Sequence, residues 1–135
     1  QLNYELFTQI NKIHRELDIF VVYKNITKSF FPIKFPIINY TKIFSGYIEN
    51  DSLLIATDLD SALTLSKVKN TSKKIFYVWE LEFLRNKNYS YNYDIYQSLP
   101  LYTRSQSYKE ALDNYANTNS DVLELNLEKL WMLNT

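Results

Sequence analysis

The spacing of hydrophobic and polar residues changes along the chain, and each pattern predicts a different kind of element. Over residues 2–17 apolar residues recur every three to four positions, which predicts an amphipathic helix. Other segments are short apolar runs rich in β-branched and aromatic residues, which are typical of buried strands in a parallel sheet. These are residues 19–23, 52–57, 73–84, 99–103 and 122–125.

Helical patterns fall between these predicted strands. Residues 62–68 form a short apolar helix pattern, and Asp58 or Asp60 can cap its first turn. A second helix is expected further on, where Ser107 and Glu110 have the spacing of a capping box. Alternating strands and helices predict an α/β fold, a Rossmann-like three-layer sandwich with a mostly parallel sheet. No linker divides the chain, so we expect a single domain over residues 1–135.

Two aromatic segments are predicted as loops. Residues 24–36 carry prolines and phenylalanines, and residues 85–98 are rich in tyrosine and asparagine. The second segment, which includes Tyr89 and Tyr91, suits stacking recognition of a sugar or a base. The alternative is a surface excursion whose rings cover the edge of the sheet. Residues 37–44 fit either a short strand or a helix.

Two glutamates at the end of the most apolar segment are the leading candidates for chemistry. Over residues 79–83 apolar side chains alternate with Glu80 and Glu82, so the two carboxylates would share one face of a strand. Open α/β sheets bind ligands outside the carboxyl ends of their strands. The alternative is that both glutamates are solvated residues on an edge, because exposed glutamates usually have no further role.

Composition excludes several classes of site. A single glycine cannot build a dinucleotide fingerprint or a P-loop, and no cysteine and one histidine leave no basis for a zinc site. We therefore expect no metal and no cofactor. With 15 basic and 15 acidic residues the net charge is zero, unlike a non-specific nucleic-acid binder. The chain has no apolar run of membrane-spanning length, and the absence of cysteine favours a cytoplasmic setting.

The order of strand ends and turns resembles the N-terminal half of a GT-B-type glycosyltransferase, of the kind found in tailed phages and bacteria. The resemblance extends over roughly residues 2–130 and depends on the series of motifs rather than on any one of them. The segments that carry it are residues 53–58, 74–82, 102–105, 121–124 and 126–127.

This resemblance implies a function. Such enzymes have two Rossmann-like domains facing a cleft, and they move a sugar from a nucleotide-sugar donor to an acceptor hydroxyl. The N-terminal domain holds the acceptor and a carboxylate base, for which a raised pKa is suitable. The resemblance assigns this role to Glu80, with Glu82 and Asp58 as alternatives.

The resemblance also implies substrate-binding residues. Arg104 and Ser105 open a predicted helix, where Arg104 would meet a phosphate or the acceptor, and Tyr89 and Tyr91 would line the same site. The alternative for Arg104 is a structural salt bridge.

Two parts of such an enzyme have no counterpart in this sequence, namely a strand before the first helix and the whole donor domain. We therefore expect the chain to be a fragment of a longer protein, inactive alone, with the donor bound by another domain. The competing hypothesis is a non-catalytic Rossmann-like module that binds a protein or a glycan through its aromatic loops. That hypothesis predicts an exposed aromatic patch and a structurally paired Glu80. A small nucleotide-binding domain is a third hypothesis, and the lack of glycine argues against it.

Overall fold

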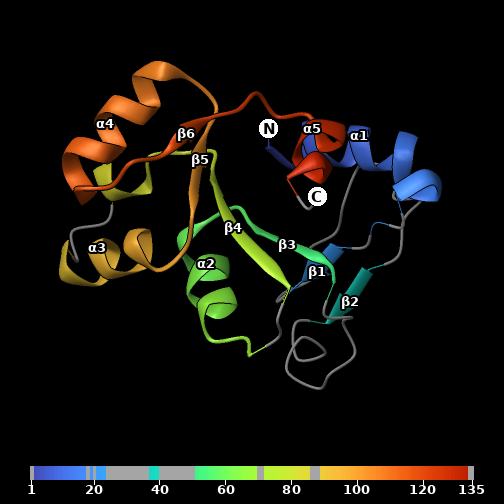
Figure 1. The fold of residues 1–135 in the computed structure, drawn as a ribbon, viewed down its shortest axis with the longest axis horizontal. Helices are drawn as coiled ribbons and strands as arrows, with labels where there is room; N and C mark the ends of the chain where they lie inside the picture. The colour runs from blue at the N-terminus through green and yellow to red at the C-terminus, as the bar shows by residue number, and fades with distance from the viewer. Residues whose placement is uncertain are drawn as a thin grey trace.

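The computed structural model describes residues 2–17, 19, 21–23, 37–39, 51–69, 72–85 and 89–133 (Figure 1). The predicted loop at 24–36 lies outside these residues. In chain order the elements are α1 (Leu2–Leu17), β1 (Val21–Tyr23), β2 (Ile37–Asn39), β3 (Leu53–Ala56), α2 (Leu59–Ser66), β4 (Lys73–Val78), the 3₁₀ helix η2 (Glu82–Leu84), α3 (Tyr89–Ser98), β5 (Leu101–Thr103), α4 (Gln106–Ala116), β6 (Asp121–Val122) and α5 (Leu127–Met132).

The main sheet has four strands in the order β3-β4-β5-β6, and every neighbouring pair is parallel. Ile55 lies opposite Ile75, Tyr77 opposite Tyr102, and Thr103 opposite Val122. β1 and β2 form a separate two-stranded parallel sheet. The predicted α/β fold with a parallel sheet is confirmed.

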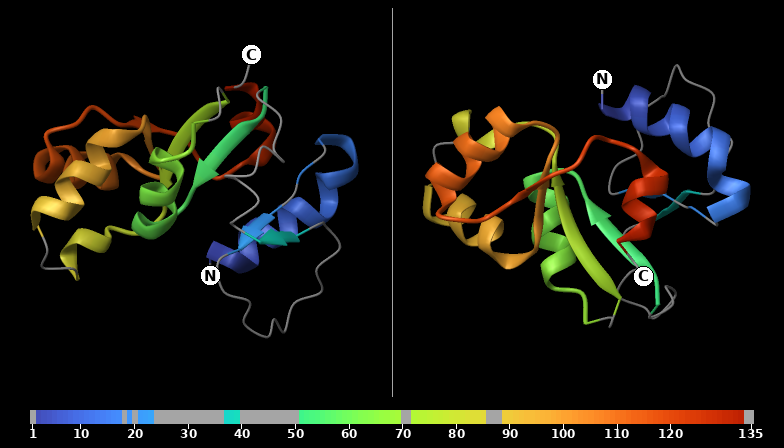
Figure 2. Two further views of the ribbon diagram at one scale, coloured as in Figure 1. Left: turned by 90° about the horizontal axis from the view of Figure 1, so that it is seen from below. Right: turned by 45° about the horizontal axis from the view of Figure 1, so that its top comes forward.

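Helices cover both faces of this sheet, which gives three layers (Figure 2). The helices α2, α3 and α4, which connect the four strands, pack their apolar residues on one face. The helices α1 and α5 pack on the other face. Successive side chains of β4 alternate between the two cores, with Phe76 and Val78 on the first face and Ile75 and Tyr77 on the second. All of them are fully buried, as the continuous apolar run predicts.

The second face is closed by segments from opposite ends of the chain. Ile10 of α1 and Leu130 of α5 are both buried in the core on this face. The side-chain amide of Gln9 donates to the Leu125 carbonyl (2.9 Å) and accepts from the Leu127 N–H (3.0 Å). None of the described helices is long and apolar enough to cross a membrane.

Helix caps fix the starts of α2 and α4 at the carboxyl edge of the sheet. Asp58 caps α2 by accepting the Ser61 N–H (2.7 Å), and Ser61 returns the contact to the Asp58 backbone, as in a capping box. The predicted cap at Ser107 is wrong, because the N-cap of α4 is Ser105, which accepts the Tyr108 N–H. The helix ends at Asn117, whose left-handed backbone (φ 54°) is typical of a helix C-terminus.

The predicted strand over residues 73–84 is too long. β4 ends at Val78, and the chain then turns, with the Glu82 N–H donating to the Glu80 carbonyl (3.0 Å) before η2 begins. Glu80 and Glu82 therefore lie on a turn and not on one strand face. This turn directs Leu81 and Phe83 onto the core under α2 and α3, so their burial produces the alternation that resembled a strand.

The predicted loop over residues 85–98 is also wrong, because most of it is the helix α3. Asn92, Ile95 and Tyr96 are buried at helical spacing, and the Tyr96 ring stacks on Phe76 of β4 with centroids 5.7 Å apart. Tyrosine and asparagine have only modest helix propensity, so packing against the sheet decides the conformation of this segment.

Candidate functional site

The carboxyl ends of β3, β4 and β5 meet at one edge of the sheet, because the strands are parallel. Asp58 follows β3, Glu80 and Glu82 follow β4, and Arg104 and Ser105 follow β5. The five residues predicted from these segments are therefore brought to the same edge. Tyr89 and Tyr91 lie in the first turn of α3, and their side chains are outside the described part of the structure.

Of the three carboxylates predicted at this edge, Glu82 is half-buried and is held by a hydrogen bond from another element. Its Oε1 accepts the N–H of Leu59, the first residue of α2 (3.0 Å). Burial raises the pKa of Glu82, and the negative charges of Asp58 and Glu80 raise it further. The Leu59 hydrogen bond and the Arg85 charge oppose this increase without cancelling it. A carboxylate that binds its proton more tightly than usual is a better base for a hydroxyl proton.

The other two carboxylates have different surroundings. Glu80 is exposed, with 56% of its side chain accessible, and forms an ion pair with the exposed Arg85. Such a surface pair contributes little to stability. The side chain of Asp58 is used as the cap of α2. Asp58 and Glu80 therefore act on Glu82 mainly through their charge.

The guanidinium of Arg104 lies over two aromatic rings. Its guanidinium carbon lies 4.4 Å from the centroid of the Trp79 ring and 4.5 Å from that of Tyr108, and it donates a hydrogen bond to the Tyr108 hydroxyl. Within the described part of the chain Arg104 forms no ion pair, so the salt bridge considered as its alternative is not seen there. Contacts of this kind hold the cation in place at about 0.5–1 kcal/mol each.

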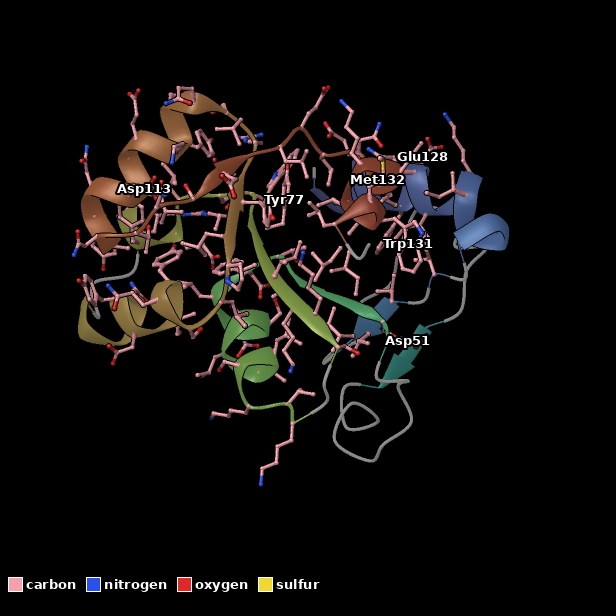
Figure 3. All side chains as sticks on the ribbon, viewed as in Figure 1. Asp51, Tyr77, Asp113, Glu128, Trp131 and Met132 are labelled. Atoms are coloured by element: carbon pink, nitrogen blue, oxygen red, sulfur yellow. The ribbon has the colours of Figure 1, made fainter. Side chains whose placement is uncertain are left out.

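Tyr77 lies on the face of the sheet that α1 and α5 cover (Figure 3), in the same core cluster as Trp79. Its hydroxyl donates to the Leu123 carbonyl (2.6 Å). Burial raises the pKa of Tyr77 to about 12, with Arg104 lowering it and the carboxylates of Glu124 and Glu5 raising it. Tyr77 therefore remains protonated at neutral pH and serves as a hydrogen-bond donor to the backbone.

Ser105 has a structural task at this edge. Its hydroxyl accepts the Tyr108 N–H (3.3 Å) and lies 3.1 Å from the Ser107 hydroxyl. The neighbouring Thr103 is fully buried and donates to the Ser105 carbonyl (3.3 Å). These bonds fix the backbone on either side of Arg104, so Ser105 contributes to the site by positioning its neighbour.

Two aromatic residues that contact Arg104 were not predicted as site residues from the sequence. Trp79 is only 8% exposed and reads as an ordinary core residue, yet its ring face supports Arg104. Tyr108 follows Arg104 by four residues, and this spacing at a helix start is the one signal that pairs them. The sequence alone places neither ring, because the contact depends on where β4 ends.

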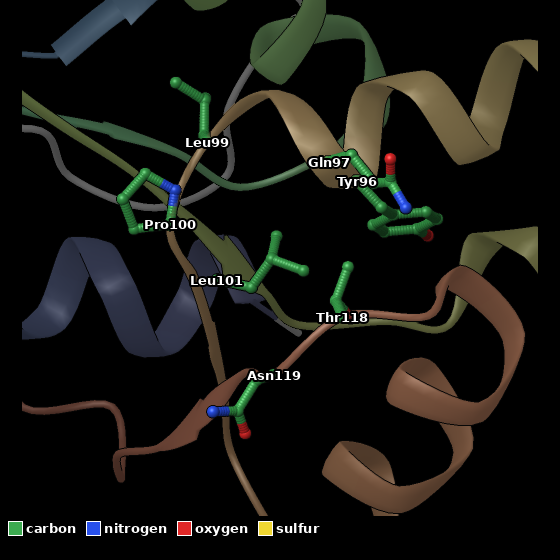
Figure 4. A pocket seen from close by; sticks show the side chains of 7 residues that line it. All are labelled: Tyr96, Gln97, Leu99, Pro100, Leu101, Thr118 and Asn119. Carbon is green, nitrogen blue, oxygen red and sulfur yellow. The ribbon is translucent and has the colours of Figure 1, made fainter.

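A concave region lies at the amino ends of β5 and β6 (Figure 4). It is an open hollow of about 330 Å³ lined by Tyr96, Gln97, Leu99, Pro100, Leu101, Thr118 and Asn119. None of the predicted site residues lines it.

The described residues contain no group of three His, Cys, Asp or Glu side chains placed to hold a metal ion. Comparison with protein-family models, curated proteins and solved structures finds no match. The chemistry of the carboxyl edge must therefore be inferred from its geometry.

Proposed function

We propose that this chain is the acceptor-side domain of a GT-B-type glycosyltransferase, as in tailed phages and bacteria, and that Glu82 is its catalytic base. The observation that carries the proposal is the environment of Glu82: a half-buried carboxylate with a raised pKa, anchored through one oxygen at the carboxyl edge of a parallel sheet. Glu82 replaces Glu80 as the leading candidate because Glu80 is exposed and paired with Arg85.

The proposed reaction needs one proton transfer, from the acceptor hydroxyl to Glu82 of this domain. The acceptor hydroxyl donates a hydrogen bond to Glu82, and Glu82 takes its proton as the oxygen bonds to the anomeric carbon. The bond from that carbon to the nucleoside diphosphate breaks, and the diphosphate leaves with the electron pair. The donor would be bound by a second domain, and Tyr89 and Tyr91 would stack on the acceptor sugar. The reaction would take place in the cytoplasm and would need no metal or cofactor from this domain.

Asp58 and Glu80 support Glu82 in this scheme. Both carboxylates raise the pKa of Glu82, so the base keeps its affinity for a proton although it accepts a backbone hydrogen bond. The Leu59 N–H holds one carboxylate oxygen at a fixed place, which orients the group toward the edge where an acceptor would bind.

A non-catalytic binding module is the second candidate, and the Glu80–Arg85 ion pair favours it. Against it, the aromatic residues described on α3 do not form an exposed patch. Tyr96 is fully buried, and its ring packs edge-on against Phe83 and Tyr115.

The test is a transfer assay with a panel of nucleotide sugars on the longer, two-domain protein that the proposal requires. Wild type is compared with Glu82→Gln and with the matched variant Glu80→Gln. We expect the Glu82 variant to lose at least about a hundredfold in rate and the Glu80 variant to lose less than about tenfold. Full activity of a folded Glu82→Gln protein would remove this residue from the mechanism. A wild type that uses no donor at all would favour the binding module.

A further inference from the structure

The guanidinium of Arg104 is held by contacts with two aromatic rings. Trp79 and Tyr108 each lie about one ring-stacking distance from it, at 4.4 and 4.5 Å. The N–H donors of a guanidinium lie in its plane and point outward from its edge. Of these donors, one is directed to the Tyr108 hydroxyl. The remaining edge is the part of Arg104 that can be offered to a ligand.

No carboxylate of the described residues neutralises this cation at salt-bridge distance. Glu124 and Glu5 act with Arg104 on the pKa of Tyr77, and neither forms an ion pair with Arg104. The other arginine of this edge differs, because Arg85 is paired with Glu80. A guanidinium that is immobilised and lacks a carboxylate partner is preorganised for a bidentate oxyanion.

Arg104 and Glu82 both lie at the carboxyl edge of the sheet. Arg104 follows β5, whereas Glu82 is bonded to Leu59, which follows β3. β4 lies between these strands, and both groups belong to the same carboxyl edge of the sheet. The start of α4 adds a favourable potential for a negative charge near Arg104.

We propose that Arg104 binds an anionic group, a phosphate or a carboxylate, on the acceptor molecule. Calling the ligand the acceptor rests on the proposed function, whereas the anion site itself rests on a guanidinium that lies over two rings and has no carboxylate partner among the described residues. The site then has two parts, with Arg104 binding the charged group and Glu82 facing the hydroxyl that reacts. Trp79 and Tyr108 act as positioning residues for Arg104.

The test is isothermal titration calorimetry of the 135-residue chain. Three probes are used: glucose 6-phosphate, glucuronate and glucose. The proteins are wild type, Arg104→Gln, Arg104→Lys and the control Arg85→Gln. We expect at least one anionic probe to bind wild type about tenfold or more tightly than glucose, and Arg104→Gln to lose that preference. The lysine variant should recover it only in part, because an ammonium group cannot bind bidentately or stack as a plane. The control should stay within about twofold of wild type.

Circular dichroism of each variant shows whether its fold is intact. If Arg104→Gln does not fold, Arg104→Lys, which keeps the positive charge, is compared with wild type instead. The anionic probe that binds more tightly identifies the group as phosphate or carboxylate. Unchanged binding by a folded Arg104→Gln, an equal loss in Arg85→Gln, or binding of neither anionic probe to wild type would overturn the proposal. Because binding is measured without turnover, anion binding by a protein that transfers no sugar would refute the proposed function alone.

Discussion

Two partly buried carboxylates of this molecule, Glu82 and Asp113, have pKa values shifted in opposite directions. Burial raises the pKa in both cases and is the largest single influence on each. Asp113 receives donors from Lys109 (2.9 Å), Thr118 (2.8 Å) and the Ser120 backbone (3.0 Å), and its pKa is lowered overall.

Glu82 receives one backbone donor and faces two acidic side chains, so its pKa stays raised. The number and charge of the donors, rather than burial, decide which carboxylate is structural and which is poised to accept a proton. Asp113 fastens the turn between α4 and β6, where Lys109 also donates to the Ser120 carbonyl. Glu82 lies at the edge where chemistry is proposed.

The substitution Asp113→Asn should have the largest effect on stability. It removes the charge that Lys109 binds and replaces an acceptor oxygen with an amide donor, so we expect the free energy of unfolding to fall by about 2 kcal/mol in urea. Because the folded pKa is lowered, the stabilisation by Asp113 is present above the unfolded pKa, near 3.8. It is lost as pH falls through the lower folded value. The control is Glu110→Gln, an exposed change on the same helix, and an equal loss there would contradict the assignment.

Glu82→Gln should change stability less and with the opposite sign. Glutamine keeps an acceptor for the Leu59 N–H and removes a charge that burial disfavours, so we expect a gain of about 0.5–1 kcal/mol at pH 7. The folded pKa of Glu82 is raised, so its destabilising effect is present above that value. It disappears as pH falls below the unfolded pKa, near 4.5, where variant and wild type should converge. A loss of stability at neutral pH would show that the ionised group is stabilising.

The smallest effect is expected for Glu80→Gln. Its ion pair with Arg85 is exposed on both sides, so the free energy of unfolding should change by less than about 0.5 kcal/mol. The change should also be smaller at high salt, because screening weakens exposed pairs. A larger effect, or one that resists salt, would mean that this pair helps to fix the turn before η2.

Much of the fold follows from the pattern of the chain. Continuous apolar runs mark the strands β3, β4 and β5, and their alternation with helices gives the parallel order. The end of β4 cannot be predicted from this pattern. Leu81 and Phe83 pack against the core after the strand has ended, and their spacing of two residues has the period of a strand. The helix α3 is hidden for a related reason, since among its described residues only Ile95 of the three buried ones is aliphatic and the other two are Asn92 and Tyr96.

The sequence predicts where the site lies, but not which of its side chains contact one another. Residues that follow parallel strands share an edge, so Asp58, Glu82 and Arg104 could be placed together from the sequence. Which carboxylate is buried depends on the turn after β4, and this turn puts Glu82 against α2 and leaves Glu80 in solvent. Arg104 was predicted as a ligand-binding residue, but the rings that hold it are recognised only in three dimensions.

The sequential order of the strands has a consequence for folding. Each strand from β3 to β6 pairs with the one that comes next in the chain, so these pairings and their connecting helices close only short loops. The other layer joins α1 to the segment before α5, and the bonds of Gln9 there link residues 116 and 118 positions apart. Closing so long a loop has a larger entropic cost, so α1 is expected to dock after the sheet has formed. Until it docks, the buried face of β4 that carries Ile75 and Tyr77 has one of its two covering helices missing.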